Sequence, residues 1–201
     1  GLSSPDSARK GNLFGIIGMI IAILTTLLSP EVMSYEMILL AILIGGSIGT
    51  VIALKIEMTS LPELVAAFHS LVGLAAVFVA ASAFYSPESY GIGFIGNINI
   101  ASLVEMAIGV TIGAITFTGS IIAFSKLQGI MSGAPITFSG QHFLNLLIAI
   151  SLITLITFFS INESRMIFWT IVLWSLVLGV LLILPIGGAD MPVVVSMLTS
   201  Y

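Results

Sequence analysis

Cysteine is absent from this 201-residue chain, and only 7% of its residues are charged. The absence of cysteine excludes disulfides, thiolate metal sites and a cysteine nucleophile. A soluble domain has about 25% charged residues, so this chain lacks the charge to cover a water-facing surface. Because 58% of its residues are hydrophobic and its mean hydropathy is +1.24, we expect an integral membrane protein in a lipid bilayer.

Basic residues and nucleotide motifs are also scarce. Five Lys and Arg residues face nine Asp and Glu residues, and they form no basic patch, so a nucleic-acid partner is not expected. The sequence contains no H-E-x-x-H motif and no P-loop. Residues 91–96 match G-x-G-x-x-G by letters but lie in a predicted loop, not between a strand and a helix. We therefore expect no metal or cofactor to bind this chain.

Long apolar runs dominate instead. A transmembrane helix needs about 20 apolar residues, and short loops with Pro and Gly separate six such runs. The pattern predicts an all-α polytopic transmembrane bundle that forms a single membrane domain over residues 1–201. The six complete spans are expected at residues 13–28, 35–54, 62–84, 101–124, 143–159 and 167–186.

A seventh span is expected to start at Met191-Pro192, since proline is tolerated at a helix start. Residues 191–201 provide about 15 Å of helix, whereas the hydrocarbon is about 30 Å thick. The sequence is therefore interpreted as a fragment that ends within a helix.

The basic residues predict the orientation. Arg9, Lys10, Lys55 and Lys126 fall on one side of the predicted membrane and only Arg165 on the other. Because Lys and Arg accumulate in cytoplasmic loops, the N-terminal end of the sequence is expected to be cytoplasmic. His69, His142 and Asp190 then lie nearer the cytoplasmic side, and Glu105 lies nearer the outer side.

Small residues recur at helical spacing in the third and fourth spans, and they favour close helix packing. Four hydroxyl residues of the fourth span have two open interpretations. They either line a wet path or bond back to their own helix carbonyls. The positions concerned are Ala66, Ser70, Gly73, Val77 and Ala80, then Gly109 and Gly113, and the hydroxyls of Thr111, Thr116, Thr118 and Ser120.

His69 is the main candidate for chemistry. It lies about 10 Å along the third span from Pro62. An ionisable side chain inside a span indicates function by default, and the unperturbed pKa of histidine is near physiological pH. The functional interpretation is a proton relay; the alternative is a neutral histidine that holds two helices together by hydrogen bonds.

Four further residues are weighed in the same way. Asp190 is either an N-cap for the seventh span or a relay acid that contacts a soluble domain. Glu63 is expected to stabilise the positive end of its helix. Glu105 is either an outer proton site or a solvated rim residue, and His142 is expected to lie at the interface.

Three segments in order carry a family resemblance: residues 57–76, residues 116–129 and the run Gly187-Gly188-Ala189-Asp190-Met191-Pro192-Val193-Val194-Val195. They resemble the membrane domain of the β subunit of proton-translocating nicotinamide nucleotide transhydrogenase. The resemblance implies hydride transfer between NAD(H) and NADP(H), coupled to proton movement, with both nucleotides bound by soluble domains outside this sequence. It also implies the bacterial cytoplasmic (inner) membrane, an α subunit that contributes membrane helices and an NAD(H)-binding domain, an NADP(H)-binding domain in the same β polypeptide, and a dimer of protomers.

By the same resemblance, the family's membrane histidine matches His69 and its cytoplasmic acid matches Asp190. An outer carboxylate and a hydroxyl match Glu105 and Ser120, and Thr199 replaces a family asparagine, which makes more hydrogen bonds. The expected function is the proton-translocating module of this enzyme. The rival hypotheses are a secondary transporter or antiporter-like subunit and a structural membrane anchor.

Overall fold

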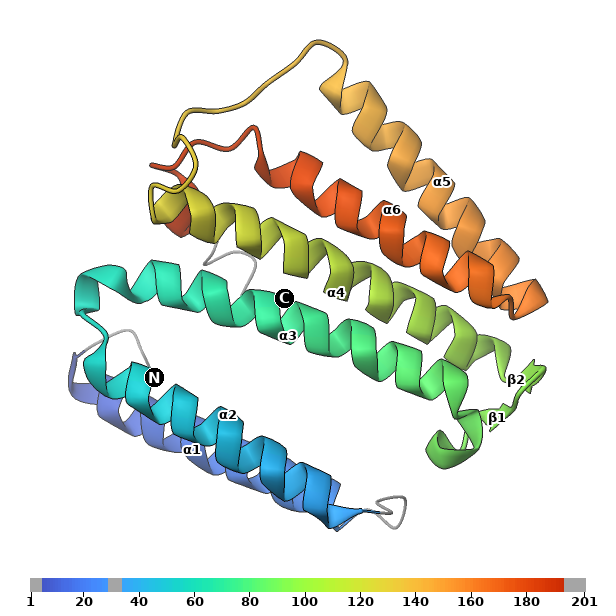
Figure 1. Cartoon of the computed structure of the whole chain (residues 1–201), viewed down its shortest axis with the longest axis horizontal. Helices are drawn as coiled ribbons and strands as arrows, with labels where there is room; N and C mark the ends of the chain where they lie inside the picture. The colour runs from blue at the N-terminus through green and yellow to red at the C-terminus, as the bar shows by residue number, and fades with distance from the viewer. Residues whose placement is uncertain (1–4, 29–33, 194–201) are drawn as a thin grey trace. The chain divides into compact units, whose positions relative to one another are not determined.

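The apolar runs fold into helices in the computed structural model, which describes residues 5–28 and 34–193. Six helices of this part are long and apolar enough to cross a membrane, so the chain is an all-α polytopic membrane bundle (Figure 1). Each falls on one predicted span. Their bounds are α1 Pro5–Leu27, α2 Tyr35–Lys55, α3 Leu61–Tyr85, α4 Ile100–Leu127, α5 Gln141–Asn162 and α6 Arg165–Ile183.

The chain divides into two compact units, Gly1–Ile56 and Glu57–Tyr201. In the first unit, the Tyr35 hydroxyl of α2 donates a hydrogen bond to the Leu27 carbonyl of α1 (3.2 Å). A Cβ atom on any of the three α2 glycines would meet nothing within 4 Å. The expectation of a single membrane domain over the whole chain stays a prediction.

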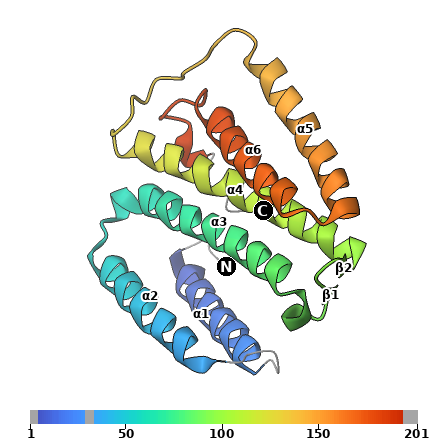
Figure 2. The ribbon, with the colours of Figure 1, turned by 45° about the vertical axis from the view of Figure 1, so that its right-hand side comes forward.

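In the second unit, α3 lies beside α4, α4 beside α6, and α6 beside α5 (Figures 1 and 2). One end of this unit, here called the hairpin end, carries the 3₁₀ helix η2 (Pro87–Tyr90), the two-residue strands β1 (Gly93–Phe94) and β2 (Asn97–Ile98), and the turn from α5 to α6. The opposite end, here called the loop end, carries η1 (Met58–Ser60), the α4–α5 connection and the segment after α6.

The strands β1 and β2 pair antiparallel, with Gly93 opposite Ile98. Gly93 has a φ of +129°, and a Cβ atom there would lie 2.5 Å from the Asn97 carbonyl oxygen, so only glycine fits. The G-x-G-x-x-G letters therefore belong to a tight hairpin between two membrane helices. They do not form the strand–turn–helix context that nucleotide binding requires.

Glycines allow α3 and α4 to touch backbone to backbone. A Cβ atom on Gly73 would lie 2.6 Å from the Gly113 carbonyl oxygen and 2.7 Å from the Phe117 nitrogen. The predicted packing stripe of α3 is confirmed, because all five of its members are buried: Ala66, Ser70, Gly73, Val77 and Ala80.

A threonine and a glycine bring α4 and α6 together. Thr118 donates to the Leu176 carbonyl of α6 (2.8 Å) and to the Ala114 carbonyl of its own helix (3.1 Å). Gly179 leaves room for this contact, since a Cβ atom there would meet the Ile115 carbonyl oxygen at 2.5 Å. Thr111 bonds back to its own helix at Ala107 (2.7 Å). Both threonines thus bond back to carbonyls of their own helix, and Thr118 also bonds α6, while a wet path along these hydroxyls stays a prediction.

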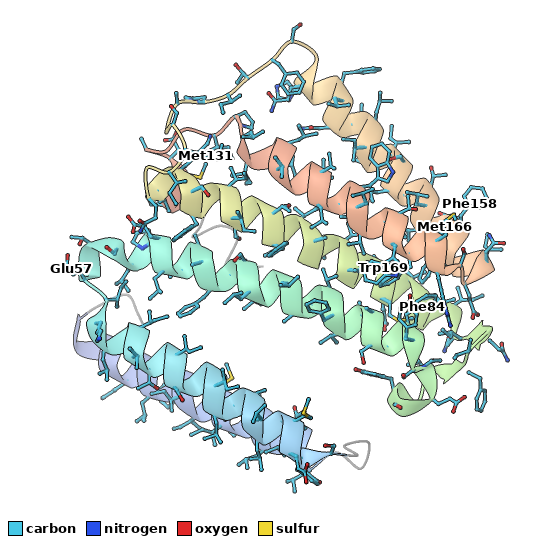
Figure 3. All side chains as sticks on the ribbon, viewed as in Figure 1. Glu57, Phe84, Met131, Phe158, Met166 and Trp169 are labelled. Atoms are coloured by element: carbon cyan, nitrogen blue, oxygen red, sulfur yellow. The ribbon has the colours of Figure 1, made fainter. Side chains whose placement is uncertain are left out.

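Aromatic rings fill the hairpin end, where Phe84 and Trp169 are labelled in Figure 3. The Phe84 ring stacks on Phe168, with centroids 5.1 Å apart, and the Trp169 Nε1 donates to the Tyr85 hydroxyl (3.0 Å). The Arg165 guanidinium lies 5.0 Å from the centre of the Tyr85 ring. These contacts hold the first turn of α6 against the last turn of α3.

Candidate functional site

His69 lines a cavity of about 450 Å³ between α3 and α4. The side chain is half-buried, and Gly73 and Gly113 form part of the same wall. Thr116 of α4 adds the one other polar side chain of the lining. The close glycine contact therefore does more than pack helices, because it brings the α3 histidine and an α4 hydroxyl to one cavity.

Residues on one face of α4 extend this site in both directions. Glu105, Gly109, Thr116 and Ser120 follow one another at intervals of four, seven and four residues, which places them along one side of a helix. The helix rise puts Glu105 and Ser120 about 22 Å apart along this line. The structure thus aligns the predicted outer carboxylate and hydroxyl with the α4 wall of the His69 cavity.

The two ends of this line differ in environment. Glu105 is exposed, whereas Ser120 is only 1% exposed. Neither contributes to the lining of the His69 cavity. Glu105 is accessible from outside the second unit, and a path to His69 through Ser120 needs water or another group between them.

Asp190 lies at the loop end and is exposed. Its backbone nitrogen donates to the Gly187 carbonyl (3.1 Å), and its carbonyl accepts from Val193 (3.2 Å). These bonds form a turn followed directly by a helical turn at residues 191–193. Helical backbone therefore begins at Met191, where the sequence predicts a span to start, while the seventh span and a cap by the Asp190 carboxylate stay predictions.

Met191 connects this turn to the site. It is fully buried, in a cluster with Ala66 of α3, Ala123 of α4 and Ile183 of α6. Ala66 precedes His69 by about one helical turn. Met191, directly after Asp190, thus packs against α3 about one helical turn before His69, toward the loop end.

Lys126 is the main residue whose role the sequence did not reveal. It is only 4% exposed, and its ammonium donates to the Leu184 carbonyl (2.6 Å) and to the Ile186 carbonyl (2.7 Å). These carbonyls follow the last turn of α6, where a cation also meets the negative end of the helix dipole. Lysine near the end of one span and free carbonyls after another were the available signals, but only tertiary structure pairs them.

Two backbone bonds fasten the α4–α5 connection to the same segment. Gly188 donates to the Gly133 carbonyl (2.8 Å), and Ile136 donates to the Leu184 carbonyl (3.1 Å). Together with Lys126, they join the segment before Asp190 to two neighbouring elements. A displacement of this loop end would therefore reach both Asp190 and the start of the seventh helix.

The remaining candidates lie outside the cavity. Glu63 is in the first turn of α3, as expected, and its carboxylate accepts from the Gln128 amide after α4. His142 is exposed in the first turn of α5. Thr199 lies outside the described residues. No group of three potential metal ligands occurs in the part of the chain that the structure describes.

Comparisons with known proteins identify the family of this chain. The profile of the NAD(P) transhydrogenase beta subunit matches residues 1–201. The chain is 60% identical over 201 residues to NAD(P) transhydrogenase subunit beta of Rhodospirillum rubrum, and a named strain of that species gives the same match. The match covers 100% of this chain and 43% of the relative, so the chain spans less than half the length of these relatives. This chain belongs to the NAD(P) transhydrogenase beta subunit family.

Proposed function

We propose that this chain is the proton-conducting membrane part of an NAD(P) transhydrogenase. Hydride transfer between NAD(H) and NADP(H) would take place in nucleotide-binding domains outside this chain, one in the rest of the β polypeptide and one in an α subunit. Family membership supports this function over an antiporter-like subunit or a structural anchor.

The observation that carries the proposal is the half-buried His69 side chain in a cavity between two membrane helices. An imidazole takes up and releases a proton near physiological pH. The cavity leaves room for water beside the His69 and Thr116 side chains, which the relay requires. His69 would accept a proton from water in this cavity and release it toward the opposite side of the membrane. Thr116 would be a neighbouring hydrogen-bonding group.

The other predicted residues would complete the route. Glu105 would exchange protons with the outer side, because it is exposed on the cavity side of α4. Ser120 and Thr199 would bond water along the inner part of the route. Asp190 would report the state of the NADP(H)-binding domain, since it is exposed in a turn one residue before the buried Met191.

Coupling requires hydride transfer in the soluble domains and proton movement in the membrane to share one conformational equilibrium. The loop end would link the soluble domains to the membrane helices. Lys126 and the Gly188–Gly133 bond connect the segment before Asp190 to α4 and to the connection that follows α4. We further propose a dimer of αβ protomers in the bacterial inner membrane, with the loop end on the cytoplasmic side.

The test is His69→Ala in the full complex, reconstituted in vesicles that contain a pH-sensitive dye. Coupled proton movement should be lost, while NADP(H) binding in the soluble domain stays close to wild type. His142→Ala is the matched control, because His142 is exposed and outside the cavity. Undiminished proton pumping by His69→Ala would refute the relay.

A further inference from the structure

A second cavity, of about 830 Å³, lies at the hairpin end, away from His69. Its walls are the α4 isoleucines Ile100 and Ile108 and the α5 isoleucines Ile153 and Ile161, and Glu163 lies at its mouth. All four isoleucines are more than 45% exposed. This groove is therefore an open apolar surface with one carboxylate, within the 300–1,000 Å³ range of ligand sites.

The length of the groove along α4 and α5 is close to the thickness of the hydrocarbon of one leaflet. Ile100 to Ile108 and Ile161 to Ile153 are each eight residues of helix, or about 12 Å. Half of the hydrocarbon thickness is about 15 Å. Glu163 terminates α5 directly before α6 begins, so we expect its carboxylate at the level where lipid headgroups begin.

Glu163 has an unused acceptor. Its Oε1 accepts from the Ile98 nitrogen of β2 (2.9 Å), while its Oε2 is buried without a hydrogen-bond partner. A buried acceptor without a partner costs free energy. Glu163 also has a φ of +47°, an unusual backbone conformation for a residue with a side chain. A glycine would relieve that strain but remove the carboxylate.

Two α5 hydroxyls in the lining of the groove also present acceptors. Ser160 donates to the Ile156 carbonyl (2.9 Å), and Thr157 donates to the Ile153 carbonyl (2.9 Å). Their protons are used within α5, so their lone pairs remain for a ligand. The nearby Arg165 faces the Tyr85 ring. The mouth therefore favours a ligand that brings a cation with several N–H donors.

We propose that this groove binds an aminophospholipid, with its primary ammonium on the Glu163 carboxylate and an acyl chain between α4 and α5. Acyl chains gain little by leaving other acyl chains, so the headgroup decides selectivity. A primary ammonium offers three donors, which the Glu163 carboxylate and the Ser160 hydroxyl would accept. Thr157 lies about 9 Å farther along α5, where it lines the part of the groove that an acyl chain would occupy. Oε1 already accepts from the Ile98 nitrogen, so Oε2 is the carboxylate oxygen left for the headgroup.

The test uses the full complex in vesicles that contain equal amounts of phosphatidylethanolamine and phosphatidylglycerol with matched acyl chains. Native mass spectrometry after mild detergent extraction measures which lipid stays bound. The wild type should retain phosphatidylethanolamine. Glu163→Gln should lower the ratio of retained phosphatidylethanolamine to phosphatidylglycerol at least about tenfold, as expected for loss of a hydrogen bond to a charged group.

Two pairs of variants separate this site from general lipid binding. Thr157→Phe fills the groove and should lose the bound lipid, whereas Thr154→Phe changes an exposed α5 threonine outside the lining and should retain it. Glu88→Gln removes an exposed acid at the same end and should leave the ratio unchanged. Because Thr157 is exposed, Thr157→Phe should keep the core contacts. Its lipid retention therefore tests the proposal even if Glu163→Gln folds poorly.

Three results would overturn the proposal. The first is an equal lipid ratio in the wild type and Glu163→Gln. The second is equal lipid retention in Thr157→Phe and Thr154→Phe. The third is a photoreactive side chain at position 157 that crosslinks to another polypeptide instead of a lipid, because the groove would then be a protein interface.

Discussion

The substitution Gly73→Ala should separate α3 from α4 and destabilise the second unit. The added Cβ atom would lie 2.6 Å from the Gly113 carbonyl oxygen and 2.7 Å from the Phe117 nitrogen, whereas ordinary contacts begin at 3.4 Å. Both neighbours are backbone atoms, so no side-chain rotation relieves the clash. The helices would have to move apart locally by about 0.7–0.8 Å, and a gap of this size forfeits a quarter to a half of each dispersion contact.

Gly109→Ala is the matched control for this prediction. Gly109 also lies on α4 and lines the His69 cavity, but its Cβ atom would meet nothing within 4 Å. Alanine is favoured over glycine in a helix by about 1 kcal/mol at both positions, so this gain cancels in the comparison. Overpacking costs about 1–3 kcal/mol, and Gly73→Ala should be less stable than Gly109→Ala by that amount.

The measurement is the thermal unfolding midpoint of the purified full complex in one detergent, with all three proteins at equal concentration. Gly73→Ala should unfold several degrees below Gly109→Ala, which should equal or exceed the wild type. Equal midpoints for the two variants would refute the backbone contact between α3 and α4. Proton pumping by each variant, measured below its midpoint, then tests whether helix separation also changes the His69 cavity.

Two further contacts give predictions of the same kind. Lys126→Met removes both ammonium bonds to the carbonyls after α6 and should destabilise the loop end by about 1–3 kcal/mol, because the Ile186 carbonyl loses its donor. Faster amide exchange at Gly188 in the full complex would report this, with the exposed Lys55→Met as control, and unchanged exchange would contradict it. Thr118→Val keeps the shape but loses the bond to α6, and should lower stability by about 1 kcal/mol. Thr111→Val, whose hydroxyl bonds its own helix, should be nearly neutral in the same unfolding assay, and equal losses would contradict the α4–α6 bond.

The sequence was most informative where a single physical requirement dominates. Hydrocarbon thickness requires long apolar helices, so six spans and an all-α membrane bundle follow from composition and run length. The small-residue stripe of α3 also followed from helical spacing, because close packing in lipid requires small side chains. Helical backbone at Met191 agrees with the proline next to it, which is tolerated at a helix start.

The candidate site was predictable only in part. His69 stands out from the sequence alone, because it is an ionisable side chain inside an apolar span. Helical periodicity also aligns Glu105 with Ser120 on α4. It does not say that Glu105 is exposed while Ser120 is buried, because that difference depends on which neighbours cover the face at each end.

Long-range pairing was decided by the tertiary structure. Lys126 reaches carbonyls 58 and 60 residues later in the chain, and Glu163 reaches the backbone nitrogen of Ile98, 65 residues earlier. In sequence, the first is a basic residue at the end of a span and the second an acid in a loop. Run length and spacing report how each helix meets the bilayer, whereas the partners of a buried charge depend on helix rotation and crossing, which arise only when the helices pack.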